Sequence, residues 1–235
     1  LSIQGKNYKT TSDVVLVIDC SGSMDGSKLT NTRKAAKAFG EKLLAKRSST
    51  RIAIVTYIDE AAAYNNGHFY TADELAAFNT AVDAATYADG GTNQQAGIHK
   101  AQELLTSAVS TGKTKSIVIL SDGEATYSYP FVGGSASIDC RNFLSHRFSG
   151  NPQVTTWPAN AVPDYTTVVG TGGDFSLDGN ILWNCKCEHN RTTNELYGSF
   201  YYDADGNFVC SNGNRSSNNG VATIWEANQA KNAGT

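Results

Sequence analysis

The sequence predicts an α/β fold with a doubly wound, mainly parallel sheet, and three observations lead to this prediction. Three short apolar runs without alternation are typical of strands buried on both faces, as in a parallel sheet. Amphipathic helical patterns separate these runs, and alternation of strands and helices is the signature of a doubly wound sheet. Polar residues directly follow the first and third runs, where such sheets bind ligands. The runs are Val14–Ile18, Ile52–Val55 and Ile117–Leu120.

Each further element has its own signal in the sequence. Apolar residues recur at helical spacing over Ser27–Lys46, with charged residues on the opposite face. Ala61–Tyr70 fits a short antiparallel edge strand. Thr71–Glu74 forms a capping box, which predicts a helix that begins there. A third helix is predicted over Asn93–Ser107.

The composition of the 235-residue chain narrows the class of function. The formal net charge is −3 and 17% of residues are charged, so the chain has no basic field for nucleic acid. No run of about 18 apolar residues is present, so no membrane span is expected. The surface must be rich in neutral polar residues, which fits an extracellular protein better than a cytosolic one.

Oxygen-bearing side chains occur in three separate segments of the chain. Asp19, Ser21 and Ser23 alternate directly after the first predicted strand. Thr92 precedes the third predicted helix, and Asp122 follows the third strand. Carboxylate and hydroxyl oxygens suit a hard cation. The same residue types also cap helices, but a cap would not require Thr92 and Asp122 as well. The sequence therefore predicts a metal site.

The three segments together resemble the metal-ion-dependent adhesion site (MIDAS) of von Willebrand factor A (vWA) domains. They are Asp19–Met24, Gly90–Asn93 and Ser121–Glu124. The resemblance covers residues 13–126 and 221–235. It implies the Rossmann-like vWA fold, with the metal at the carboxyl ends of the strands.

The resemblance also implies a role for each residue of the motif. Ser21 and Ser23 would ligate Mg²⁺ or Mn²⁺ directly, and Asp19 would act mainly through water. Thr92 and Asp122 would occupy the remaining positions, directly or through water. Because the direct ligands are mostly neutral, a carboxylate from another protein could replace a water and supply the missing charge. This is a binding site, with no catalytic residues.

A narrower resemblance points to Gram-positive pilus-tip and cell-wall-anchored adhesins. It lies in Lys28–Asn31, Lys34–Phe39 and Ser121–Tyr129. It implies an extracellular, cell-surface location and a virulence role in attachment to extracellular matrix or host-cell proteins. Other domains or pilus subunits of the same surface assembly would be further partners. The alternatives are an intracellular vWA module in a metal-chelatase-like assembly and a metal-dependent hydrolase. The sequence does not identify the residues that contact the ligand.

The domain organisation changes after the third strand. Periodicity is weak over residues 127–220, and roughly 90 residues are too many for an ordinary loop. A helix is predicted to resume near Val221–Lys231, and we expect the C-terminal strand and helix of a vWA fold to be missing from this chain. We therefore expect a lead-in from an upstream domain (1–12), a vWA core with the metal site (13–126), a disulfide-containing inserted arm (127–220) and a return to the core (221–235).

Four of the five cysteines lie in the predicted insertion, which favours disulfides formed in an oxidising compartment. A zinc site built around Cys185–His189 is the alternative. Cys20 lies inside the metal motif, where we expect a small buried residue; a disulfide to the insertion is the alternative. The four disulfide candidates are Cys140, Cys185, Cys187 and Cys210.

Overall fold

The structure is a computed structural model, and the chain divides into two compact units. The first unit comprises Leu1–Gly90, Gly97–Asp122 and Gln229–Thr235, and the second comprises Gly91–Ala96 and Gly123–Asn228. The described residues are 11–45, 49–107, 113–123, 125–129, 131–132, 138–139, 162–170, 199–202, 208–210 and 219–235.

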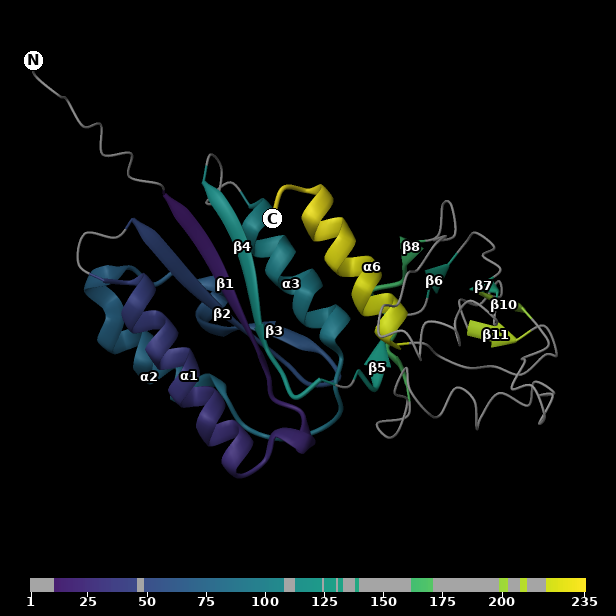
Figure 1. Ribbon diagram of the computed structural model, residues 1–235, viewed down its shortest axis with the longest axis horizontal. Helices are drawn as coiled ribbons and strands as arrows, with labels where there is room; N and C mark the ends of the chain where they lie inside the picture. The colour runs from purple at the N-terminus through teal and green to yellow at the C-terminus, as the bar shows by residue number, and fades with distance from the viewer. Residues whose placement is uncertain are drawn as a thin grey trace, which may run out of the picture. The chain divides into compact units, whose positions relative to one another are not determined.

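A four-stranded sheet with the order β3-β2-β1-β4 forms the centre of the first unit (Figure 1). The central strand β1 is parallel to β2 and β4, and β3 is an antiparallel edge strand. The predicted parallel sheet is therefore confirmed. The antiparallel edge strand predicted over Ala61–Tyr70 is present only at Ala61–Ala63, because the chain turns into a 3₁₀ helix at Tyr64–Gly67. The strands are β1 (Ser12–Asp19), β2 (Thr50–Tyr57), β3 (Ala61–Ala63) and β4 (Thr114–Leu120).

The parallel register determines which residues leave the sheet together. Asp19 is paired with Tyr57 of β2, and Ile18 is paired with Leu120 of β4. The residues that follow β1 and β4 therefore emerge at the same edge, the carboxyl edge. This edge positions the candidate site.

Helices α1 and α2 cover one face of this sheet, and α3 covers the other (Figure 1). The helix predicted over Ser27–Lys46 ends earlier, at Leu43, where the amide of Leu44 closes the last turn on Gly40. Leu44 is then buried in the core rather than extending the helix. The helices are α1 (Ser27–Leu43), α2 (Leu75–Ala85) and α3 (Gln94–Thr106), with 3₁₀ turns at Gly22–Met24, Tyr64–Gly67 and Ala72–Glu74.

The predicted capping box is present before α2. The Glu74 carboxylate accepts hydrogen bonds from the amide and the hydroxyl of Thr71, both at 2.9 Å. These two bonds lower the pKa of Glu74, because they stabilise the charged carboxylate. The helix therefore begins where the sequence predicts, through a short 3₁₀ turn.

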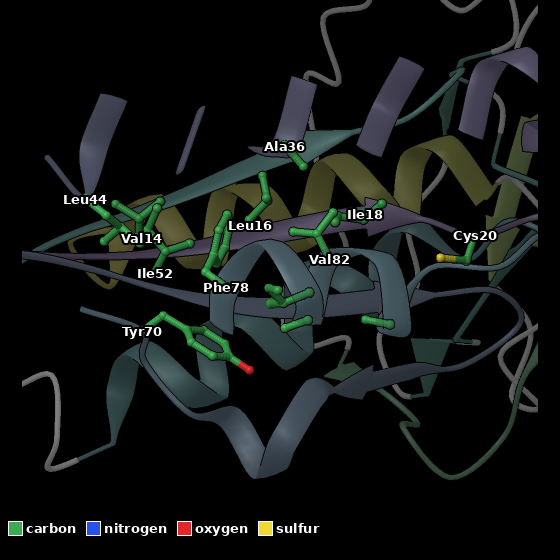
Figure 2. Packing of buried hydrophobic residues seen from close by; sticks show 13 residues of the cluster. Val14, Leu16, Ile18, Cys20, Ala36, Leu44, Ile52, Tyr70, Phe78 and Val82 are labelled. Carbon is green, nitrogen blue, oxygen red and sulfur yellow. The ribbon is translucent and has the colours of Figure 1, made fainter. Parts of the chain in front are cut away.

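Each face of the sheet has its own hydrophobic core, because successive side chains of a strand point to opposite faces. On one face, Leu16 and Ile18 of β1 lie in a cluster with Phe78 and Val82 of α2 and Ala36 of α1 (Figure 2). All five side chains are fully buried. This packing holds β1 rigidly, and with it the loop that follows β1.

The other face brings α3 close to the central strands. Val15 and Val17 of β1 cluster with Ala101 of α3. Gly97 makes the approach possible, since a Cβ there would lie 2.7 Å from the Tyr57 ring. The close packing keeps this ring in place, and its hydroxyl takes part in the candidate site.

The second unit contains short antiparallel strand pairs and most of helix α6 (Asn219–Asn232), which confirms the helix predicted near Val221–Lys231. Strand β5 pairs with β9, β6 pairs with β8, and β10 lies between β11 and β7. The strands are β5 (Tyr127–Ser128), β6 (Phe131–Val132), β7 (Ile138–Asp139), β8 (Val162–Pro163), β9 (Val169–Gly170), β10 (Ser199–Tyr202) and β11 (Phe208–Cys210).

The predicted disulfides stay predictions. Cys140, Cys185 and Cys187 lie outside the described residues, as does the side chain of Cys210. The zinc alternative around Cys185–His189 lies there too. Within the part of the chain that the structure describes, no helix has both the length and the apolar character needed to cross a membrane.

Candidate metal site

The loop after β1 is anchored by its backbone. The amide of Cys20 donates to the carbonyl of Tyr57, and the amide of Gly22 donates to the carbonyl of Gly90. The 3₁₀ turn at Gly22–Met24 then reverses the chain into α1. The side chains of this loop are therefore presented from a fixed backbone at the carboxyl edge of the sheet.

Asp19 is completely buried, and three donors hold its carboxylate. The amide of Ser21 donates to Oδ1 at 2.9 Å. The hydroxyls of Tyr57 and Ser121 donate to Oδ2 at 2.9 Å and 2.6 Å. All three donors are neutral, so the carboxylate is fixed in position while its negative charge has no cationic side chain against it among the described residues.

A chain of hydrogen bonds joins the two serines of the motif to Asp122. The hydroxyls of Ser21 and Ser23 lie 3.0 Å apart, and Ser23 donates to Asp122 Oδ1 at 3.1 Å. The ammonium of Lys28 donates to Asp122 Oδ2 at 2.7 Å. With Asp19 linked to Ser21, the structure brings together four of the five predicted residues, which come from two segments about a hundred positions apart.

Thr92 belongs to the second unit and is 3% exposed. Its amide donates to the Thr126 hydroxyl at 2.9 Å, and its carbonyl accepts from the amides of Thr126 and Tyr127. The Thr92 backbone is thus tied to the start of the predicted insertion. Its part in the metal site stays a prediction.

Cys20 is a free, buried thiol, 1% exposed. Burial raises the pKa of this thiol above its ordinary value of 9.0, with a smaller contribution from the charge of Asp19. A nucleophilic cysteine needs a lowered pKa. The interpretation of Cys20 as a small buried residue is confirmed, and the alternative of a disulfide is wrong.

The donor set at this edge fits a hard cation. It offers two carboxylates and two hydroxyls, all oxygen, which are the ligands that Mg²⁺ and Mn²⁺ prefer. No group of three or more His, Cys, Asp and Glu side chains that could hold a metal occurs among the described residues. Any cation at this edge would therefore depend on hydroxyl ligands as well as on Asp19 and Asp122.

Comparison with known proteins assigns the fold to a family. The family model of the von Willebrand factor type A domain matches residues 13–139, more than half of the chain. The chain belongs to the vWA family. The matched region contains β1 to β4 and all five residues of the predicted metal motif.

Related vWA proteins include pilus components. The chain is 32% identical over 193 residues to the minor fimbrium subunit Mfa5 of Porphyromonas gingivalis, covering 72% of this chain and 15% of Mfa5. The chain therefore spans about 15% of the length of that relative. The region it spans is a single module of a much longer protein.

Two solved structures share the fold. One is the vWF domain of the type V pili tip protein Mfa5 from Porphyromonas gingivalis, with 24% identity, a TM-score of 0.57 and coverage of 96% of this chain and 79% of that chain. The other is the pilus adhesin SpaC from Lactobacillus rhamnosus GG, with 20% identity, a TM-score of 0.59 and coverage of 97% and 23%. At these identities the similarity establishes the fold alone.

Sequence reasoning missed three residues of the site in this vWA domain. Tyr57 and Ser121 hold Asp19, and Lys28 holds Asp122. Tyr57 could have been found from the parallel register, because it is the residue that β2 places opposite Asp19. Lys28 lies in a segment that resembles pilus-tip adhesins, but nothing in the sequence links it to Asp122.

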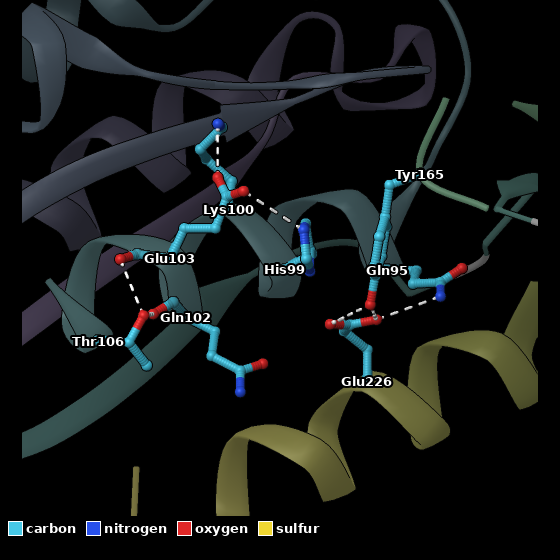
Figure 3. Close-up of polar contacts among 8 residues, drawn as sticks. All are labelled: Gln95, His99, Lys100, Gln102, Glu103, Thr106, Tyr165 and Glu226. Atoms are coloured by element: carbon cyan, nitrogen blue, oxygen red, sulfur yellow. Dashed lines mark hydrogen bonds and ion pairs between the residues drawn. The ribbon is translucent and has the colours of Figure 1, made fainter. Parts of the chain in front are cut away.

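A buried polar network in the second unit of the vWA domain was also missed. Glu226 of α6 is 1% exposed and accepts hydrogen bonds from the Tyr165 hydroxyl, at 3.2 Å and 3.0 Å, and from the Gln95 amide at 3.2 Å (Figure 3). Gln95 in turn accepts from the amide of Tyr129, whose ring packs edge-to-face on Tyr165. The network links the first turn of α3 to two segments of the predicted insertion and to α6.

Proposed function

We propose that this vWA domain is a cell-surface adhesion module of the pilus-tip type, which binds a carboxylate of a protein ligand through Mg²⁺ or Mn²⁺. The observation that supports this most strongly is the buried Asp19 carboxylate, held by neutral donors only, beside two hydroxyls and Asp122. A buried carboxylate is costly unless it is compensated, and a cation bound beside the neutral donors would add the opposite charge that Asp19 lacks.

The residues of the site would have different roles in binding the ion. The Ser21 and Ser23 hydroxyls would be direct ligands, while Asp19 and Asp122 would act directly or through water, with Thr92 as the fifth residue. The bound ion would supply an electrophilic centre for an external carboxylate. Asp19 is held by Tyr57 and Ser121, so the protein need not reorganise it when a cation arrives.

The relatives support a place at the cell surface. The similar proteins are pilus tip proteins and a pilus adhesin, so we propose that the chain is one module of a surface assembly. Its partners would then be other domains or pilus subunits and an extracellular matrix or host-cell protein. We propose binding rather than catalysis, in keeping with the similar pilus adhesin and pilus tip protein. The buried Cys20 thiol, whose pKa burial raises, is in addition a poor nucleophile.

Titration of the metal-free protein with Mn²⁺ tests the site directly. Isothermal calorimetry should show one Mn²⁺ per chain, and Asp19→Asn or Asp122→Asn should weaken binding by about tenfold or more, because each removes a charged partner of the ion. Asp83→Asn is the matched control: Asp83 is an exposed aspartate paired with Lys37 at 2.6 Å on the helical side of the fold. Unchanged Mn²⁺ affinity in both site variants would contradict the proposal.

Adhesion is tested with a panel of immobilised extracellular matrix proteins. Binding of the wild-type domain should disappear in EDTA and return with Mg²⁺, whereas Asp19→Asn should not bind in either condition. Circular dichroism should show the same fold for every variant. Binding to the matrix proteins that persists in EDTA would contradict the proposed role of the cation.

A further inference from the structure

Lys28 occupies an unusual position beside the proposed metal site. It is the second residue of α1, and the first turn of this helix contains no acidic residue. A cation in the first turn of a helix is disfavoured by the helix dipole. Its ammonium nevertheless reaches Asp122 Oδ2 at 2.7 Å, in a pair whose side chains are 55% and 18% exposed. The ion pair with Asp122 offsets the unfavourable interaction of the Lys28 charge with the helix dipole.

The contact leaves the rest of the site intact. Lys28 uses Asp122 Oδ2, whereas Ser23 uses Oδ1, so the two donors do not compete for one oxygen. Asp19 has no such partner, because its three donors are neutral. The site therefore combines two carboxylates with a single ammonium, and its net charge is −1.

We propose that Lys28 sets the charge balance of the site, so that a divalent cation binds less tightly and the loaded site keeps one net positive charge for an incoming carboxylate. This inference rests on the proposed function. Without the ammonium the loaded site would be neutral, since the two carboxylates would cancel the charge of the ion. Lys28 thus determines specificity for an anionic group while it lowers metal affinity.

The first test compares Mn²⁺ affinities at low ionic strength. Lys28→Gln should bind Mn²⁺ about three- to tenfold more tightly than wild type, because a repulsive charge near the ion is removed but remains partly screened by water. Lys28→Arg keeps the charge and should stay near the wild-type affinity. Lys37→Gln is the matched control: it makes the same charge change on the same helix, at a lysine that pairs with Asp83 instead.

The second test measures acceptance of a carboxylate, with acetate as the probe. Acetate that replaces a water on protein-bound Mn²⁺ lowers the relaxation rate of bulk water protons. With each variant saturated with Mn²⁺, Lys28→Gln should need about threefold or more acetate for half of the effect, and Lys37→Gln should match wild type. Raising the ionic strength should shrink both differences, since Lys28 is exposed.

The outcomes separate this inference from the proposed function. If wild type binds no Mn²⁺, the metal site itself is wrong. If wild type binds Mn²⁺ but Lys28→Gln binds it equally or more weakly, Lys28 does not repel the ion and the inference is overturned. The inference also fails if Lys28→Gln binds Mn²⁺ more tightly but keeps the wild-type acetate response, because the loaded site would not depend on this charge.

Discussion

Two buried carboxylates stand at opposite ends of the same strand, and their partners differ in charge. Asp13 and Asp19 of β1 are both 0% exposed. The Arg51 guanidinium donates two hydrogen bonds to the Asp13 carboxylate, at 2.8 Å and 2.6 Å, and the Lys113 ammonium donates a third at 3.1 Å. Asp19 is held by an amide and two hydroxyls. The charge of Asp13 is therefore compensated by cationic side chains, and the charge of Asp19 is not.

Under the proposed function, this difference separates a structural carboxylate from one that holds a cation. At the amino end, Arg51 also lies over the ring of Phe69, 5.0 Å from its centroid, so the ion pair is part of the packing. At the carboxyl end, neutral donors fix Asp19 and leave its charge available to a cation from solution. Burial alone does not distinguish the two carboxylates; the charge of their partners does.

The largest effect should come from neutralising the two aspartates separately. Asp13→Asn should lower the free energy of unfolding by about 3 kcal/mol, because Arg51 and Lys113 lose their charged partner. Asp19→Asn should cost less, about 1–2 kcal/mol in metal-free buffer, because the amide replaces one acceptor oxygen of the three neutral donors but no cation loses its partner. Urea unfolding with EDTA present measures both.

The effect of the two substitutions on Mn²⁺ affinity should be the reverse of their effect on stability. Asp13→Asn should keep the wild-type Mn²⁺ affinity wherever it remains folded, whereas Asp19→Asn should lose it. Equal destabilisation by the two substitutions would mean that the charges of the partners do not distinguish the two ends of β1.

Much of this distinction could be predicted from the sequence. Asp19 directly follows an apolar run, and Asp122 follows another after one residue. Parallel strands end at one edge, so their convergence follows from topology. The charge balance could not be predicted in the same way. Lys28 reaches Asp122 through a long side chain, and the sequence pattern shows only that Lys28 is charged. Arg51 is the residue that the parallel register pairs with Asp13, but the sequence alone does not supply that register.

The second unit was less predictable for a different reason. Glu226 binds Gln95 and Tyr165, which lie 131 and 61 positions away in the sequence. None of the three stands in a motif, and Glu226 lies on a helix whose pattern predicts only its existence. Hydrogen bonds between segments so far apart in the sequence leave no local pattern that could predict them.

A smaller effect should follow from removing one neutral donor of Asp19. Tyr57→Phe should lower the free energy of unfolding by about 1–2 kcal/mol, because the buried carboxylate loses one of its three hydrogen bonds. Tyr87→Phe makes the same chemical change at a side chain that is 51% exposed, and it should stay within about 0.5 kcal/mol of wild type. Chemical denaturation at neutral pH compares them. Equal stability of the two variants would mean that the hydroxyl does not support Asp19.

The smallest effect concerns the proton on Cys20, next to Asp19. Burial and, to a lesser degree, the Asp19 charge hold the pKa of the thiol above 9.0 in the folded state. The folded chain therefore keeps this proton to a higher pH than the unfolded chain, so the contribution to stability is complete below pH 9.0 and declines above it. The free energy of unfolding should fall between pH 8 and pH 10 (roughly one pH unit on each side of this value), and the fall should be shallower in Cys20→Ala, since all other groups titrate alike in both proteins. If the free energy of unfolding depended on pH identically in wild type and Cys20→Ala, neither burial nor the Asp19 charge would shift the pKa of the thiol. That result would weaken the case that the two ends of β1 differ electrostatically.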